Sequence, residues 1–136
     1  MNRILSITIA ALALWACVPA TGTVGGNEPA TQAAPELRGD IEAARQGWQR
    51  IEQGALILDV RSEGEFAAGH LEGAVRVDYT DTEALAAAIG DDPERPVVLY
   101  CGSGRRAGIA QSALEELGYT EVFNASGLDA LEATQP

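Results

Sequence analysis

Short apolar runs divide the sequence into segments of strand length and segments with helical spacing. The runs ALILDV (55–60) and VVLYC (97–101) are continuously apolar, as expected for strands buried on both faces of a parallel sheet. Two shorter strands are predicted at AVRV (74–77) and TEVFNA (120–125). The hydrophobic pattern therefore predicts four strands.

Around these strands, apolar residues recur three and four positions apart, which predicts helices. Helix-capping residues are expected at Asp40 and Ser62, and at either Thr80 or Asp81. The predicted helices cover 40–54, 62–69, 80–90 and 105–118, followed by a helical turn at 127–133. The expected buried face of the first comprises Ile41, Ala44, Trp48 and Ile51, and that of the fourth comprises Ile109, Ala113, Leu114 and Leu117.

The alternation of strands and helices predicts an α/β domain with three layers, in which helices cover both faces of a parallel sheet. Ligand sites in such sheets lie outside the carboxyl ends of the strands. Cys101 ends the predicted strand 97–101 and directly precedes a predicted helix. The first place to look for chemistry is therefore the loop after Cys101.

The N-terminal segment has the organisation of a secretory signal. Arg3 precedes an apolar core at 4–16, which is shorter than the roughly 20 residues that a membrane span needs. The sequence LWAC, ending at Cys17, resembles the lipobox of bacterial lipoproteins. It predicts a signal peptide at 1–16 and a lipidated Cys17 as the first mature residue; the alternative is cleavage after Ala20.

Residues 17–37 are rich in Gly, Pro, Thr and Ala and have no apolar periodicity, which is typical of a flexible tether. The globular domain is then predicted for 38–136. Either cleavage site predicts export to the periplasm, and the lipobox adds a lipid anchor in a membrane. Val18 stands where an aspartate is associated with inner-membrane retention, which favours the outer membrane.

The charge of the chain narrows the class of its partners. It contains 20 Asp and Glu residues against 9 Arg and Lys, for a net charge of −11 at pH 7. This excess of negative charge argues against nucleic acid as a partner.

One cysteine lies in a turn rich in glycine and arginine, within VVLYCGSGRRAG. Because Cys17 belongs to the predicted signal, Cys101 has no predicted disulfide partner, and its polar neighbours predict an exposed thiol rather than a core cysteine. Gly102 and Gly104 permit a tight curl that points N–H groups into one concavity. The following helix N-terminus, with Arg105 and Arg106, adds positive charge that favours the thiolate.

The loop CGSGRR resembles the C-x-x-G-x-R loop of rhodanese-type sulfurtransferases, with Cys101, Gly104 and Arg106 on its fixed positions. The upstream segment 56–77 resembles the family's other motif, D-V-R followed by E-[FY]-x-x-G-H-[IL]-x-G-A. The exported, single-domain arrangement is similar to the phage-shock type within the family. The matching upstream residues are Asp59, Val60, Arg61, Glu65, Phe66, Gly69, His70, Leu71, Gly73 and Ala74.

The resemblance implies a two-step sulfur transfer. The catalytic Cys101 takes a sulfane sulfur from a small anionic donor, thiosulfate or a persulfide, and passes it to a thiophilic acceptor such as cyanide or a thiol. It implies no metal and no organic cofactor. The persulfide would be stabilised by the backbone N–H groups of Gly102, Ser103, Gly104, Arg105 and Arg106.

Three supporting residues lie in the upstream motif. Asp59 is expected to hold loops by hydrogen bonds. Arg61 is expected to pair with an acid such as Glu65, with substrate binding as the alternative. His70 is expected to have a structural role rather than to act as the base of a Cys/His pair.

The loop residues have simpler expectations. Arg106 either orients the loop or contacts the anion, while Arg105 points to solvent. Ser103 contributes either its hydroxyl group or merely its small size.

Two other functions share part of this pattern. Cysteine phosphatases and arsenate reductases use a C-x5-R loop, whereas four residues separate Cys101 from Arg106, which gives a smaller basin. A tethered persulfide carrier or binding module without appreciable turnover is the other alternative. The presence of Cys101 favours an enzyme but does not separate turnover from stoichiometric carriage.

Overall fold

A computed structural model of the chain describes residues 38–136. The predicted signal peptide at 1–16, its alternative end at Ala20, Cys17 and the predicted tether at 17–37 lie outside the described residues.

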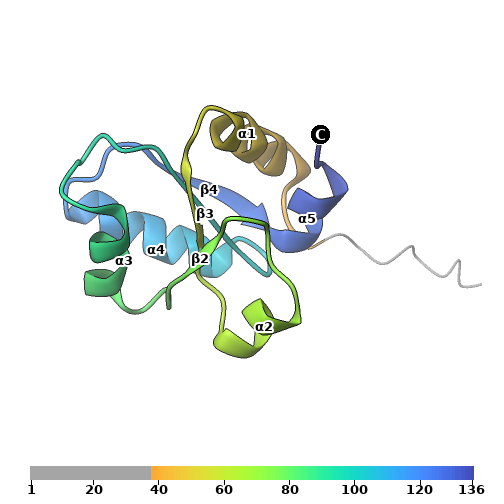
Figure 1. Cartoon of the computed structure of the whole chain (residues 1–136), viewed down its shortest axis with the longest axis horizontal. Coiled ribbons are helices and arrows are strands. Elements are labelled where there is room, and N and C mark those ends of the chain that lie inside the picture. The colour runs from red at the N-terminus through yellow and green to blue at the C-terminus, as the bar shows by residue number, and fades with distance from the viewer. Residues whose placement is uncertain (1–37) are drawn as a thin grey trace, which may run out of the picture. The chain divides into compact units, whose positions relative to one another are not determined.

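The core of the domain is a parallel sheet of four strands in the order β2-β1-β3-β4 (Figure 1). The strands are β1 (Leu56–Asp59), β2 (Val75–Arg76), β3 (Val97–Cys101) and β4 (Val122–Gly127). All three pairings are parallel, so the carboxyl ends of the strands meet at one edge of the sheet. Each predicted strand is present, although β2 is shorter than predicted and β4 continues to Gly127.

Five helices surround the sheet: α1 (Ile41–Glu52), α2 (Glu63–Ala68), α3 (Thr82–Ile89), α4 (Arg105–Glu116) and α5 (Leu128–Ala133). The predicted caps are present at Asp40 and Ser62, and Asp81 rather than Thr80 caps α3. No helix between residues 38 and 136 is long and apolar enough to cross a membrane.

Two apolar clusters, one on each face of the sheet, hold the layers together. Figure 1 shows α1 and α5 on one face and α3 and α4 on the other. Because side chains alternate along a strand, Leu99 and Cys101 of β3 join the cluster that contains α3 and α4 residues. Val98 and Tyr100 join the cluster that contains α1 and α5 residues. The predicted three-layer α/β fold is confirmed.

The predicted buried face of α4 is wrong in part. Ile109 and Leu117 are 47% and 57% exposed. The residues that pack on the sheet are Ala107, Ala110 and Leu114. These also recur at helical spacing, but two of them are alanines, whose small side chains add little to a hydrophobic pattern. The prediction followed the larger isoleucine and leucine instead.

Candidate functional site

Cys101 lies at the carboxyl end of β3 and has no exposed surface. The sequence predicted an exposed thiol, and that prediction is wrong. The side chain points into the apolar cluster under α3 and α4, and the Gly104 N–H donates a hydrogen bond to its Sγ atom at 3.0 Å. Polar neighbours in sequence do not expose Cys101, because the loop that contains them turns back toward the sulfur.

The curl of the loop depends on glycine at position 104. Gly104 is the N-cap of α4 and has a φ of 92°, a left-handed conformation that L side chains seldom adopt. A Cβ atom there would lie 3.1 Å from the Cα atom of Ser126. A side chain at this position would therefore force apart the loop and the end of β4.

Arg106 is fixed by Glu65 of α2. Its Nη1 and Nη2 atoms donate to the two carboxylate oxygens of Glu65, each at 2.7 Å. Glu65 also accepts from the backbone and side chain of Ser62 in a capping box. The hydrogen bonds from Arg106 lower the pKa of Glu65 well below its usual range, and the same pairing raises the pKa of Arg106. Of the two roles expected for Arg106, this geometry supports orientation of the loop.

Asp59 and Arg61 form a buried ion pair, with side chains 0% and 7% exposed. Nη2 of Arg61 donates to the Asp59 carboxylate and to the Gly69 carbonyl oxygen, each at 2.6 Å. Arg61 pairs with an acid, as predicted, but the acid is the nearby Asp59 and not the suggested Glu65, which pairs with Arg106 instead. The hydrogen bond with Asp59 raises the pKa of Arg61. The expected role of Asp59, holding loops by hydrogen bonds, agrees with this geometry.

His70 is exposed and contacts Phe66 twice. The two rings stack with their centroids 3.7 Å apart, and the Nδ1 atom of His70 lies 2.9 Å from the Phe66 carbonyl oxygen. Both contacts favour the structural role expected for His70 over that of a base for Cys101.

The other two arginines near the carboxyl ends of the strands, Arg76 and Arg105, differ in how far nearby acidic groups neutralise their charge. Arg76, at the end of β2, donates from Nε to the Arg61 carbonyl oxygen at 3.2 Å and lies 3.7 Å from Asp78. Arg105 is exposed, as expected, and forms no ion pair with any residue in 38–136. Ser103 is exposed as well. Arg105 therefore supplies the least neutralised positive charge of the loop.

Sequence reasoning missed two residues at the end of β4. The Nδ2 atom of Asn124 donates to the Gly104 carbonyl oxygen at 2.9 Å, and Ser126 packs against Gly104. The segment NASG, 124–127, combines residue types that favour turns, and this signal could have marked an irregular strand end beside the loop.

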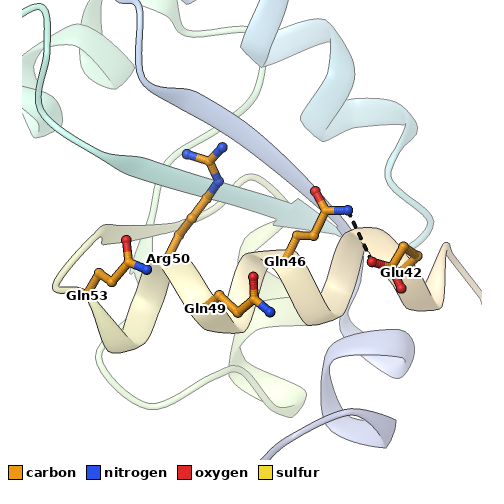
Figure 2. A pocket seen from close by; sticks show the side chains of 5 residues that line it. All are labelled: Glu42, Gln46, Gln49, Arg50 and Gln53. Atoms are coloured by element: carbon orange, nitrogen blue, oxygen red, sulfur yellow. Dashed lines mark hydrogen bonds between the residues drawn. The ribbon is translucent and has the colours of Figure 1, made fainter.

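Two surface hollows of the described residues have linings that do not include the Cys101 loop. One of about 470 Å³ follows the exposed side of α1 and is lined by Glu42, Gln46, Gln49, Arg50 and Gln53 (Figure 2). Another, of about 340 Å³, includes His70 in its lining but not Cys101. The α1 hollow contains no nucleophile, so the Cys101 loop is the better candidate for chemistry. Residues 38–136 hold no group of three or more His, Cys, Asp or Glu residues placed to bind a metal ion.

Comparison with known proteins gives consistent matches. The sequence profile of the rhodanese-like domain matches residues 43–128. The chain is 35% identical over 71 residues to thiosulfate sulfurtransferase PspE of Escherichia coli strain K12, covering 52% of this chain and 68% of that protein. A solved structure described as a rhodanese with anions from E. coli has a TM-score of 0.53 and 35% identity, covering 57% of this chain and 91% of that one. A tRNA uridine(34) hydroxylase of Chlamydia abortus is 31% identical over 103 residues, covering 65% of this chain but 32% of the relative.

Proposed function

Because the chain belongs to the rhodanese-like domain family, we propose that it is a thiosulfate sulfurtransferase in which Cys101 carries the transferred sulfur as a persulfide. Membership of the family and similarity to thiosulfate sulfurtransferases support sulfur transfer in general. The choice of Cys101, and of thiosulfate as a donor, is the specific part of the proposal.

The observation that carries the proposal is the hydrogen bond from the Gly104 N–H to the Sγ atom of Cys101, at 3.0 Å. A charged sulfur is a stronger hydrogen-bond acceptor than a neutral one, so this N–H is placed to stabilise the negative charge that the sulfur carries during transfer. The sulfur also lies before the first turn of α4, where the helix dipole favours negative charge. Both effects would act in the same way on the terminal sulfur of a persulfide.

In the first step, the Cys101 thiolate attacks the outer sulfur of thiosulfate. A bond forms between the two sulfur atoms, and sulfite leaves with the electron pair of the broken bond. In the second step, the carbon of cyanide or a thiolate attacks the outer sulfur. Thiocyanate or a new persulfide leaves the site, and the electron pair of the sulfur–sulfur bond returns to Cys101. No proton has to be removed from a nucleophile if the thiolate is already formed.

The position of Arg106 argues against the phosphatase alternative. A phosphatase needs its loop arginine to grip the anion above the thiolate, since bidentate hydrogen bonds suit phosphate oxygens. Here both terminal nitrogens of Arg106 bind Glu65. The short loop and the engaged arginine together favour a sulfur atom as the transferred group.

Intact-mass analysis after exposure to thiosulfate tests the proposal. The full chain should gain the mass of one sulfur atom, and Cys101→Ser should abolish this gain. Cys17→Ser is the matched control, because it removes the other thiol and leaves the loop unchanged. If the native chain gains no sulfur and forms no thiocyanate with thiosulfate and cyanide, the proposal is wrong. Sulfur uptake with only one thiocyanate formed per chain would indicate a carrier rather than an enzyme.

We also propose that the protein is exported to the periplasm and anchored in a membrane, the outer membrane in preference, through a lipid on Cys17. This rests on sequence alone: the signal-like segment for export, the lipobox-like LWAC for the lipid, and Val18 for the outer membrane. Cys17→Ser should block processing or release the protein from the membrane fraction. Recovery of the native chain as unlipidated protein cut after Ala20 would instead support ordinary signal cleavage.

A further inference from the structure

The end of β4 contains a bulge that lies against the Cys101 loop. The register with β3 pairs Leu99 with Asn124 and then Cys101 with Gly127, so β4 contains an extra residue between these pairs. Ser126 within the bulge has a φ of 77° and is the one non-glycine residue of 38–136 with a positive φ. Such a conformation is unfavourable for serine and persists only where its surroundings hold it.

Hydrogen bonds from two directions hold the bulge. The Oδ1 atom of Asn124 accepts from the Ser126 N–H at 2.9 Å. The Oγ atom of Ser126 accepts from the backbone N–H of Asp40, the N-cap of α1. The bulge is therefore anchored on its own strand and on the segment that begins the domain.

From this anchored position, Asn124 reaches the loop. Its Nδ2 atom donates to the Gly104 carbonyl oxygen at 2.9 Å, and the same oxygen accepts from the Gly108 N–H of α4 at 2.9 Å. Two donors thus fix one carbonyl group at the start of the helix. That group belongs to the Gly104–Arg105 peptide, which directly follows the peptide whose N–H donates to the sulfur.

A peptide unit is planar, and in the trans form its N–H points away from its C=O. No peptide bond in 38–136 is cis. Fixing the Gly104 carbonyl therefore also fixes the Arg105 N–H, which belongs to the first residue of α4. N–H groups at a helix start have no partner within the helix and point beyond its N-terminus, and the N-terminus of α4 directly follows the loop after Cys101.

We propose that Asn124 is a positioning residue for sulfur transfer: by holding the Gly104 carbonyl, it directs the Arg105 N–H toward the reactive sulfur beside the Gly104 N–H. The expected effect of Asn124 on the rate of sulfur transfer rests on the proposed function. The expected effect of Asn124 on the reactivity of the Cys101 thiolate does not depend on whether sulfur is transferred. Asn124 touches neither the sulfur nor a substrate in this arrangement and acts only through the Gly104–Arg105 peptide.

Gln111 supplies a matched control. Its Nε2 atom also donates to a backbone carbonyl, that of Val122, at 3.1 Å. The bond likewise joins α4 and β4, but it lies away from the loop. Asn124→Ala removes the bonds to Gly104 and Ser126, and Gln111→Ala removes those to Val122 and Glu115. Each variant thus loses one amide–carbonyl bond and one further hydrogen bond, so a merely structural role would give similar losses in thermal midpoint and no difference at the sulfur.

The test uses the full chain and follows alkylation of Cys101 by iodoacetamide, with the labelled peptide identified by mass, together with sulfur uptake from thiosulfate. Asn124→Ala should lower the alkylation rate near neutral pH about fivefold, the effect of one hydrogen bond, while the rate at alkaline pH stays near that of the native chain. Sulfur uptake should slow by a similar factor. Gln111→Ala should leave both rates unchanged.

The positioning role is overturned if Asn124→Ala and Gln111→Ala have the same alkylation rates at both pH values. Should Asn124→Ala fail to fold, Asn124→Ser, which keeps a hydroxyl group, is compared with Gln111→Ser by the same criterion. If the native chain takes up no sulfur, the proposed function fails, yet the alkylation rates still decide whether Asn124 acts on the thiolate.

Discussion

Arg106 and Glu65, 41 residues apart in sequence, form a two-pronged ion pair with both nitrogen–oxygen distances at 2.7 Å. The pair joins the first turn of α4 to the first turn of α2. Because Arg106 directly follows the loop of Cys101, this link fixes one end of the loop to the rest of the domain. The two halves of the sequence pattern, the upstream motif and the cysteine loop, are thus in direct contact.

Replacing Glu65 tests the pH dependence of this link. The folded-state pKa of Glu65 lies below its unfolded value of 4.5, so the stabilisation is complete above that value and is lost as the pH falls through the folded-state pKa. Glu65→Gln should therefore be less stable than the native chain at neutral pH, and the difference should shrink below about pH 4.5. Urea unfolding at several pH values measures this difference.

Glu42 provides the control for that experiment, because its contact with Arg45 is 4.0 Å long and both side chains are more than 60% exposed. Glu42→Gln should change the stability little at any pH. If the stability difference between Glu65→Gln and the native chain stays constant down to strongly acidic pH, the ion pair of Glu65 with Arg106 is not its cause.

A methyl group at position 104 should damage both the loop and the chemistry. Gly104→Ala places a Cβ atom 3.1 Å from the Ser126 Cα atom and forces alanine into a φ of 92°. We expect a loss of about 1–3 kcal/mol in the free energy of unfolding and, because the Gly104 N–H moves away from the sulfur, a clear drop in thiocyanate formation. Gly90→Ala, with a φ of 92° and nothing within 4 Å of the new Cβ atom, should lose stability but keep activity. Equal activity losses in both variants would contradict a specific role for Gly104.

Arg105 should affect how the site attracts its anionic donor. The chain carries a net charge of −11, and Arg105 is the exposed cation of the loop that has no ion pair within 38–136. Arg105→Gln should raise the KM for thiosulfate a few-fold, with the effect fading at high salt, because exposed charges are screened. Steady-state kinetics at two ionic strengths measures this. Arg45→Gln makes the same change in net charge at an exposed position of α1. An equal rise in KM for this variant would show that only the net charge of the protein matters.

The corrected face of α4 can be tested with two identical substitutions. Leu114 is fully buried and Leu117 is 57% exposed. Leu114→Ala should cost about 2–5 kcal/mol in the free energy of unfolding. Leu117→Ala should change it by no more than about 1 kcal/mol. Comparable losses of stability in the two variants would support the buried face of α4 that was predicted from the sequence.

Local signals in the sequence predicted most of the fold. Asp40 and Ser62 cap helices as expected, and the apolar runs become strands of the central sheet. These features depend on a few neighbouring residues, so spacing and residue type suffice to predict them. The loop after Cys101 belongs to the same class, because its glycines and the following helix are adjacent in sequence.

Features that depend on competition between distant groups were less predictable. Both Asp59 and Glu65 could have paired with Arg61, and only the three-dimensional structure shows that Arg106 takes Glu65. The burial of Cys101 has the same origin, because the loop and α4 enclose a side chain whose sequence neighbours are polar. The role of Asn124 depends on a bulge that shifts the register of β4, which no apolar pattern encodes.

The complete burial of Cys101 has a consequence for which molecules it can meet. A thiol without exposed surface cannot reach the cysteine of a second protein, so disulfide-linked dimers should not form while the loop stays closed. Bulky oxidised thiols are hindered in the same way, whereas a compact inorganic anion needs only a small opening. In an oxidising compartment, the enclosing loop would then protect Cys101 from large oxidants, because the size of a reagent would decide whether it reaches the sulfur.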